Sequence, residues 1–187
     1  MSSYPVIKDD VQIEIEVKRS RFIAFAIRVS GNEHAKQALH TLRERYPDAS
    51  HHCYAFVSGA PSNSQGYGCS DDGEPSGTAG KPIFARVHHS GIGELLIVVV
   101  RYFGGTKLGT GGLVRAYGDA ATAVMEQIET QEYVEQKELE ITVPYNREGD
   151  VRRAIEKLEG EIIDVAYAEQ ATIKLRIPHD ASLPSFY

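Results

Sequence analysis

Alternating apolar and polar residues mark a first pair of strands near the start of the chain. Residues 11–17, VQIEIEV, change character at every position, and residues 22–29, FIAFAIRV, are mostly apolar. A period of two residues is typical of a half-buried strand. The basic stretch KRSR at 18–21 interrupts the pattern as a turn. The two segments are therefore expected to pair as a hairpin.

Two more strands and three helices are expected before residue 130. HHCYAFV at 51–57 and ELLIVVVRYFGG at 94–105 read as strands, the second apolar on both faces at its centre. Apolar residues at helical spacing predict helices at 32–46, 78–89 and 110–128. Their expected N-caps are Asn32, Thr78 and Thr110. Between them, residues 59–77 have no apolar period and are expected to form a long loop.

The sequence becomes more polar after residue 128. Residues 129–138, ETQEYVEQKE, are polar and acidic and resemble a linker. The segments ELEITVPY, REGDVRRAIEKLEG, EIIDVAYAEQ and ATIKLRIP then predict strand, helix, strand and strand, the first part of a βαββαβ unit. We expect an α+β protein with domains at 1–130 and 136–187. The second domain is expected to lack its last helix and strand because the sequence is cut short.

Composition narrows the class of protein. The 187 residues carry a formal net charge of -6, which argues against broad, non-specific nucleic-acid binding but leaves room for a local basic site. Two cysteines without a CxxC pair favour a reduced, intracellular protein. The longest apolar run, LLIVVV at 95–100, is far too short to span a membrane. We therefore expect a cytoplasmic protein.

A glycine-rich loop precedes the third expected helix, in the stretch RYFGGTKLGTGGLVRAYGDAA at 101–121. Glycines at a helix N-terminus let backbone N–H groups approach a ligand, and the helix dipole favours an anion there. The expected site consists of the charges of Arg101, Lys107 and Arg115 and the N–H groups of Gly111 and Gly112. This design suits a phosphate or a carboxylate.

A simpler interpretation of the same stretch is also open. It contains neither the GK[ST] of a P-loop nor a GxGxxG in a βαβ setting. The loop could be only a tight connection, with Arg115 paired to Asp119 one helical turn later.

The stretch SDDGEPSGTAGKP at 70–82 is the second candidate for a functional site. Its charged residues are Asp71, Asp72, Glu74 and Lys81. The acids could bind a divalent cation, set a turn ahead of a helix, or hold basic residues of the glycine loop. The spacing does not match a calcium loop, so we expect no metal. We expect the loop to turn at Gly73 and to present its acids to Lys107 or Arg101.

The histidines and cysteines give weaker signals. His51 and His52 are neighbours on a strand, so they point to opposite faces and cannot easily share a metal. Cys53 lies on the same face as His51, which allows a nucleophilic pair. A buried, inert thiol is the interpretation that we favour.

The two long motifs resemble the YigZ/IMPACT family in its bacterial form. They are DDGEPSGTAGKP at 71–82 and VVVRYFGGTKLGTGGLVRAY at 98–117, with KRSRFIA and HHCYAFV at the expected places. The similarity covers about residues 11–176. It implies a first domain similar to the second domain of a small-subunit ribosomal protein, a four-stranded sheet with helices on one side. The second domain is similar to the last domain of elongation factor G and ferredoxin-like, here without its final helix and strand.

The resemblance implies only a little about function. Eukaryotic relatives restrain a translation-control kinase by competing for its activator, with the help of a domain that this chain lacks. We expect a non-enzymatic module that binds RNA, the ribosome or a protein partner near translation, without a cofactor and without membrane attachment. The alternative is a phosphate-handling enzyme that uses the glycine loop and the acidic loop. The sequence does not define an oligomeric state.

Overall fold

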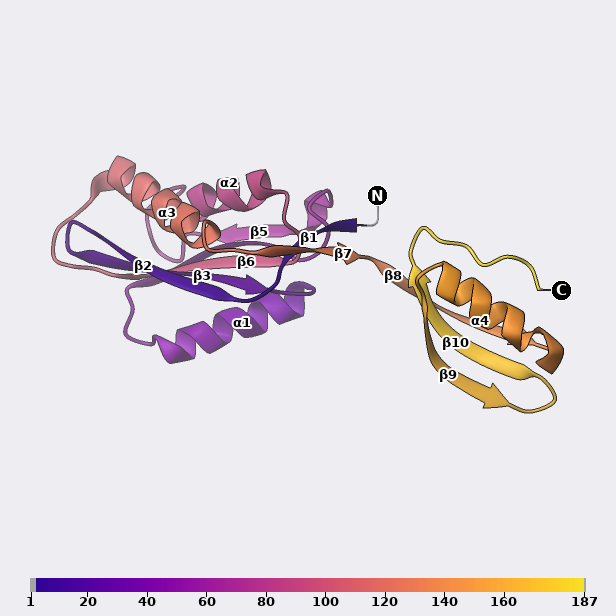
Figure 1. Cartoon of the computed structure of the whole chain (residues 1–187). Coiled ribbons are helices and arrows are strands. Elements are labelled where there is room, and N and C mark those ends of the chain that lie inside the picture. Colours follow the sequence, from indigo (N-terminus) through magenta and orange to yellow (C-terminus); the bar gives the residue numbers. More distant parts are fainter. Residues whose placement is uncertain (1–2, 187) are drawn as a thin grey trace. The chain divides into compact units, whose positions relative to one another are not determined.

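The computed structural model describes residues 3–186 and shows a mixed α/β protein with two compact units (Figure 1). One unit is formed by Tyr4–Glu132 and the other mainly by the residues from Tyr133 onward. Two core clusters lie in the first unit and a third lies in the second. The expected α+β class and two-domain architecture are thus confirmed. Among the described helices, none has the length and apolar character needed to cross a membrane.

A five-stranded antiparallel sheet forms the centre of the first unit. Its order is β2-β3-β6-β4-β5. The bounds are β2 (Val11–Val17), β3 (Ser20–Arg28), β6 (Leu95–Tyr102), β4 (His51–Val57) and β5 (Tyr67–Ser70). The expected hairpin is confirmed, because β2 and β3 pair from one end to the other.

The expectation of four strands was wrong because β5 lies inside the segment expected to be a loop. A short 3₁₀ turn, η1 (Ser64–Gly66), leads into this strand, which pairs with the end of β4. β5 has only four residues and no apolar alternation that a pattern could reveal. Gly68 permits the pairing, because a Cβ there would lie 2.6 Å from the Phe56 ring.

Helices cover both faces of this sheet, not one face as expected (Figure 1). α1 (Asn32–Arg45) packs on one face, and α2 (Gly80–Ser90) and α3 (Gly109–Met125) pack on the other. The central strand β6 explains the arrangement, since a strand buried on both faces is apolar throughout. Its Leu96, Val98 and Val100 face α1, whereas Leu95, Ile97 and Val99 face α2 and α3.

The helix starts differ from the expected caps. The N-cap positions are Gly31, Ala79 and Leu108, and no side chain at these positions makes a capping hydrogen bond. The Thr78 hydroxyl donates instead to the Pro75 carbonyl. At the other end of α2, Gly91 adopts the left-handed conformation, which is typical of a glycine that ends a helix.

The sequence did not predict two short strands, which contain the first and the last residues of the first unit. β1 (Ser3–Ile7) pairs with β7 (Thr130–Val134) in a separate two-stranded sheet. Val6 and Ile7 are fully buried, and the Lys8 N–H donates to the Glu129 carbonyl at 2.9 Å. The segment expected to be a linker is therefore mostly strand.

The second unit has the expected order of strand, helix, strand and strand. It contains β8 (Gln136–Val143), the short turn η2 (Tyr145–Arg147), α4 (Glu148–Lys157), β9 (Glu161–Tyr167) and β10 (Ala171–Pro178). The antiparallel order β8-β10-β9 is that of a split βαβ arrangement, with the third strand between the first two. α4 buries Val151 and Ile155 against the apolar side chains of β10.

Candidate functional site

A buried charged cluster joins the acidic loop to the end of β6. Glu74 accepts hydrogen bonds from Arg101 Nη1 at 2.6 and 2.9 Å and from the Tyr117 hydroxyl at 2.7 Å. His51 Nε2 lies 3.1 Å from the other carboxylate oxygen. Glu74 and Arg101 are only 9% and 5% exposed. Each oxygen of Glu74 therefore has two partners, and the carboxylate is saturated.

Three different parts of the fold place these side chains. His51 begins β4 and pairs in register with Arg101 near the end of β6, so the β4–β6 ladder sets their separation. Tyr117 reaches the cluster from α3, and Glu74 reaches it from the loop between β5 and α2. Sequence reasoning named Glu74 and Arg101 but missed His51 and Tyr117, whose approach depends on strand register and helix rotation.

Aromatic rings surround the arginine and hold it in place. The Arg101 guanidinium lies 5.6 Å from the ring centroids of both Phe22 and Phe103, and its Nη2 donates to Ser20 Oγ at 3.3 Å. Its buried Nε has no hydrogen-bond partner among the described residues. Burial raises the pKa of Tyr117 far above its ordinary value, so this hydroxyl stays protonated and donates to Glu74.

The other two acids of the loop have separate tasks. The Asp71 carboxylate accepts from the backbone N–H groups of Gly77, Ala79 and Gly80 and so occupies the start of α2. Asp72 Oδ2 accepts from the His52 N–H at 2.7 Å, on the edge of β4. The expectation that the acids face Lys107 or Arg101 therefore holds for Glu74 alone.

The loop itself turns where the sequence indicated. Gly73 has a φ of 85°, and Asp72 before it also has a positive φ, of 42°. Within residues 3–186, no group of three His, Cys, Asp or Glu side chains is arranged to hold a metal ion.

A pocket of about 390 Å³ opens above the charged cluster at the start of α3. Its lining residues are His51, Glu74, Pro75, Arg101, Phe103, Lys107, Leu108, Gly109, Thr110 and Leu113. Phe103 is 51% exposed, so part of its ring is open to the solvent. The pocket thus combines an apolar wall with the basic Lys107 and the first turn of a helix.

The remaining predicted residues lie on another side of α3. Lys81, Gly111 and Arg115 line a groove of about 640 Å³ between α2 and α3, and Gly112 lines neither hollow. The structure therefore does not gather the five expected anion-binding residues into one site. No ion pair joins Arg115 to Asp119 in the described part of the chain, so the simpler interpretation of this motif was wrong in that detail.

Cys53 is held as a protonated thiol. Its Sγ donates to the Asp71 carbonyl at 3.1 Å, and burial raises its pKa to about 12. His51 Nδ1 faces the Asp72 carbonyl at 2.7 Å instead of the sulfur. The predicted nucleophilic pair of Cys53 and His51 is therefore not formed, and the expected burial of the thiol is confirmed.

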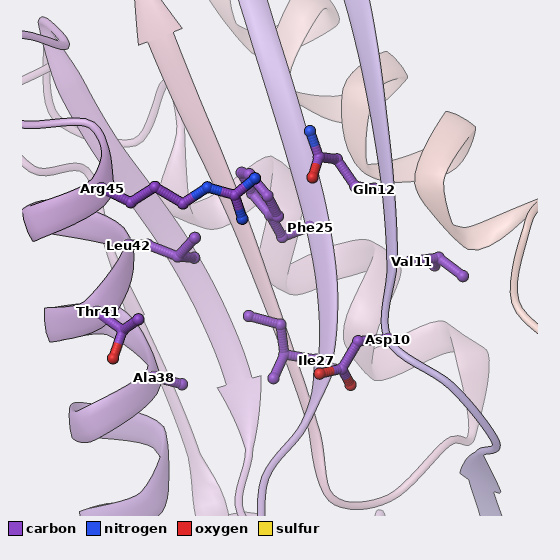
Figure 2. Close-up of a pocket in the computed structure, with 9 residues that line it drawn as sticks. All are labelled: Asp10, Val11, Gln12, Phe25, Ile27, Ala38, Thr41, Leu42 and Arg45. Carbon is purple, nitrogen blue, oxygen red and sulfur yellow. The ribbon is translucent and has the colours of Figure 1, made fainter.

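A third hollow, of about 340 Å³, lies between α1 and the strands β2 and β3 (Figure 2). Arg45 extends from α1 toward the ring of Phe25, with 6.0 Å between the guanidinium carbon and the ring centroid. The carboxylate of Asp10 accepts from the Arg28 N–H at 2.9 Å. The two charged groups that line this hollow, Asp10 and Arg45, have opposite sign, whereas Arg101 and Lys107 face the single acid Glu74 in the pocket at α3.

Comparisons with known proteins agree with this two-unit organisation. The family model described as Impact N-terminal domain matches residues 18–125, and the one described as Domain of unknown function (DUF1949) matches residues 141–182. The IMPACT family member YigZ of Escherichia coli (strain K12) is 42% identical over 177 residues, which are 95% of this chain and 86% of that protein. The IMPACT family member YvyE of Bacillus subtilis (strain 168) is 32% identical over 90% of this chain and 77% of that protein.

A solved structure also resembles the whole chain. It is described as the crystal structure of a hypothetical protein, is 40% identical in sequence, and superposes with a TM-score of 0.77. The match covers 95% of this chain and 86% of the other. The chain therefore belongs to the IMPACT family.

Proposed function

We propose that this protein is a non-enzymatic binding module that works near translation, and that its pocket at the start of α3 holds one nucleotide of an RNA strand. Membership of the IMPACT family supports the connection with translation. The chemistry of the pocket supports RNA as the partner, because it offers an aromatic face, a free cation and helix N–H groups within one hollow.

The observation that carries this proposal is the contrast between the starts of α2 and α3. A carboxylate, from Asp71, already neutralises the start of α2. The start of α3 has no such group among the described side chains, although helix N-termini attract anions. Lys107 lies beside it in the pocket and has no ion-pair partner in residues 3–186. A phosphate can bind at the start of α3 in the same way that the Asp71 carboxylate binds at the start of α2.

The apolar wall of the pocket can bind the base of the nucleotide, whose phosphate lies at the start of α3. Proteins that bind single-stranded nucleic acid stack bases on aromatic rings next to cations that contact phosphate. The half-exposed Phe103 provides such a ring beside Lys107. A volume of about 390 Å³ falls within the range of small-ligand sites, roughly 300–1,000 Å³.

The same geometry speaks against acid–base or nucleophilic catalysis by the buried cluster. Glu74 is saturated by its four contacts, and both ring nitrogens of His51 already face acceptor oxygens. The thiol of Cys53 and the hydroxyl of Tyr117 have raised pKa values and stay protonated near neutral pH. The polar groups of these side chains are already engaged or stay protonated, and none of them is a free base.

The test is fluorescence anisotropy with a labelled single-stranded RNA and the variants Phe103→Ala and Lys107→Ala. Loss of base stacking should weaken binding by roughly 5- to 150-fold, the equivalent of about 1–3 kcal/mol. Loss of Lys107 should reduce the slope of log K against log salt by about 0.7, the value for one phosphate contact on a single strand.

Matched controls remove an exposed aromatic ring and an exposed lysine elsewhere. Tyr167→Ala in β9 and Lys36→Ala in α1 serve this purpose, since both side chains lie outside the pocket. The proposal fails if Phe103→Ala and Lys107→Ala fold normally and bind RNA as tightly as the controls do.

A further inference from the structure

We propose that the groove between α2 and α3 is a track for the phosphates of single-stranded RNA, continuing from the pocket at the start of α3. This inference rests on the proposed function and extends it from one nucleotide to a strand. It assigns a task to Lys81, Arg86 and Arg115, which the pocket does not use.

The charge of the groove is one-sided. Three basic side chains line it, against the single acid Asp119. None of the three basic groups takes part in an ion pair within residues 3–186, although other exposed basic residues, such as Arg21 and Arg152, have close acidic partners. In a protein with a net charge of -6, three unneutralised cations in one hollow make a local anion site.

One of these cations is held in a fixed position. Arg86 Nε donates to Thr122 Oγ1 at 2.9 Å, which ties its guanidinium from α2 to α3. Its Nη2 lies 3.0 Å from where a Cβ at position 118 would sit, so Gly118 makes room for it. A pre-positioned guanidinium loses less side-chain entropy when it binds phosphate than a free one does.

The first turn of α3, residues 109–112, separates the groove from the pocket by a ridge on which Thr110 is the one residue that is not glycine. Gly109 and Thr110 line the pocket, whereas Gly111 and Arg115 line the groove. A Cβ at Gly111 would have no other atom within 4 Å, so the space above it is open. A strand with one base in the pocket can cross this ridge closely and lay its next phosphates in the groove.

The occupant that fits is single-stranded RNA, because a base can enter the pocket only when it is unstacked and unpaired. In an RNA duplex every base is paired, so a duplex would reach the groove alone. An acidic peptide would match the charge of the groove but has no base for the wall formed by Phe103.

The experiment compares a trinucleotide with a 12-nucleotide single strand, using the double variant Lys81→Ala/Arg115→Ala. Binding of the trinucleotide should stay at the wild-type level. Binding of the longer strand should weaken roughly tenfold at low salt, and its salt slope should fall by about 1.4, two phosphate contacts at about 0.7 each. The control Lys36→Ala/Arg43→Ala removes two exposed charges from α1, outside both hollows, and should change neither value.

Gly118→Ala gives a second, independent readout that keeps all charges. The added methyl group would crowd the Arg86 guanidinium, which has to shift from its position, so the longer strand should bind several-fold more weakly while the trinucleotide is unaffected. Circular dichroism and thermal unfolding show whether each variant is folded.

The outcomes separate the two proposals. If the groove variants bind the long strand as the wild type does while Phe103→Ala and Lys107→Ala lose affinity, the groove is not a phosphate track and the pocket remains. Equal affinity for a duplex, or binding of polyglutamate in place of RNA with the same dependence on Lys81 and Arg115, overturns the single-stranded occupant. If no RNA binds to the wild type, both proposals are wrong.

Discussion

Three acids within four residues have three different tasks, and the partners that reach each of them decide which. Asp71 satisfies backbone N–H groups at the start of α2, Asp72 satisfies the edge of β4, and Glu74 neutralises a buried arginine. Each contact is made across at least six residues of sequence. The acidic loop therefore links α2, β4 and β6 to one another, and contacts within the fold satisfy its three carboxylates.

The Glu74–Arg101 pair should be far more important for stability than any surface pair. Glu74→Gln leaves the guanidinium buried without a counter-charge, which should lower the free energy of unfolding by about 3–5 kcal/mol. The change Glu14→Gln removes the exposed pair with Arg21 and should lower the free energy of unfolding far less. Urea denaturation of both variants makes the comparison.

A second variant shows that the loss comes from the isolated charge. Adding Arg101→Met to Glu74→Gln removes the uncompensated guanidinium and should recover part of the stability. Equal losses for Glu74→Gln and Glu14→Gln would contradict the assignment of a buried ion pair.

Asp71 should make stability depend on pH in the acid range. Burial acts to raise its pKa, but hydrogen bonds from Gly77, Gly80 and Ala79 outweigh this effect and lower the pKa below its ordinary value near 4. The stabilisation is therefore complete above about pH 4 and is lost as the pH falls through the lowered pKa. Asp71→Asn keeps one acceptor oxygen but places an amide NH₂ against the Gly77 N–H, so it should lower the free energy of unfolding by about 1–3 kcal/mol at pH 7.

The measurement is urea denaturation of wild type and Asp71→Asn at pH 7 and at successively lower pH. The difference between the two proteins should shrink as the pH approaches and passes the lowered pKa of Asp71. A difference that stays constant down to pH 2 would show that the carboxylate charge has no part in capping α2.

Sequence reasoning could predict the contact between Glu74 and Arg101, because both residues lie on segments that follow a strand and precede a helix. It could not predict that Asp71 turns back to α2, since a cap supplied from nine residues upstream leaves no local motif. His51 and Tyr117 were missed for a related reason. Their positions depend on the β4–β6 register and on the rotation of α3, which no single segment encodes.

At the scale of elements, one glycine of the first turn of α3, Gly111, is not required by the fold. Gly111 has ordinary backbone angles and open space around it, whereas Gly80 in α2 sits against the backbone of Ser70. A glycine in a helix that needs neither a positive φ nor a close contact destabilises the helix. Its presence at position 111 fits a surface where another molecule approaches the backbone.

Gly111→Ala should therefore stabilise the protein and weaken RNA binding. Removing backbone freedom from the unfolded chain should add about 0.4–1 kcal/mol to the free energy of unfolding. The new methyl group should hinder a strand that crosses the ridge. In contrast, Gly80→Ala forces a Cβ to within 2.8 Å of the Ser70 carbonyl carbon and should destabilise by about 1–3 kcal/mol.

Thermal or urea unfolding and RNA anisotropy on the same samples give both readouts. A Gly111→Ala protein that is more stable and binds RNA unchanged would show that no ligand approaches this turn.

The strength of the local pattern decided which elements could be predicted. β2 alternates regularly, and β3 and the centre of β6 are mostly apolar, so these strands were found with nearly the right ends. β5 has four residues without alternation, and β1 and β7 are short strands that pair across more than a hundred residues. Such elements are stabilised by their partners, and a partner distant in sequence leaves no local signal.

At the scale of the whole molecule, each of the two units has a core of its own. The first contains both sheet faces with their helices, and the second buries α4 against β10. The chain passes between β7 and β8 through Glu135 alone. Separate hydrophobic cores are typical of domains that fold independently. We expect the residues up to about 130 to form one such domain and those from 136 onward the other.

Limited proteolysis tests this division. A glutamate-specific protease should cut first after Glu132, which is exposed, or after the half-buried Glu135, since both lie where the two units meet in sequence. Cleavage there breaks few contacts of either core, so a stable fragment that ends near residue 132 should accumulate and be identified by mass spectrometry. Glu14 and Glu16 serve as internal controls, because they belong to β2 and are held in the sheet. Cleavage mainly at those residues, or no lasting N-terminal fragment, would show that the first unit does not fold as a domain of its own.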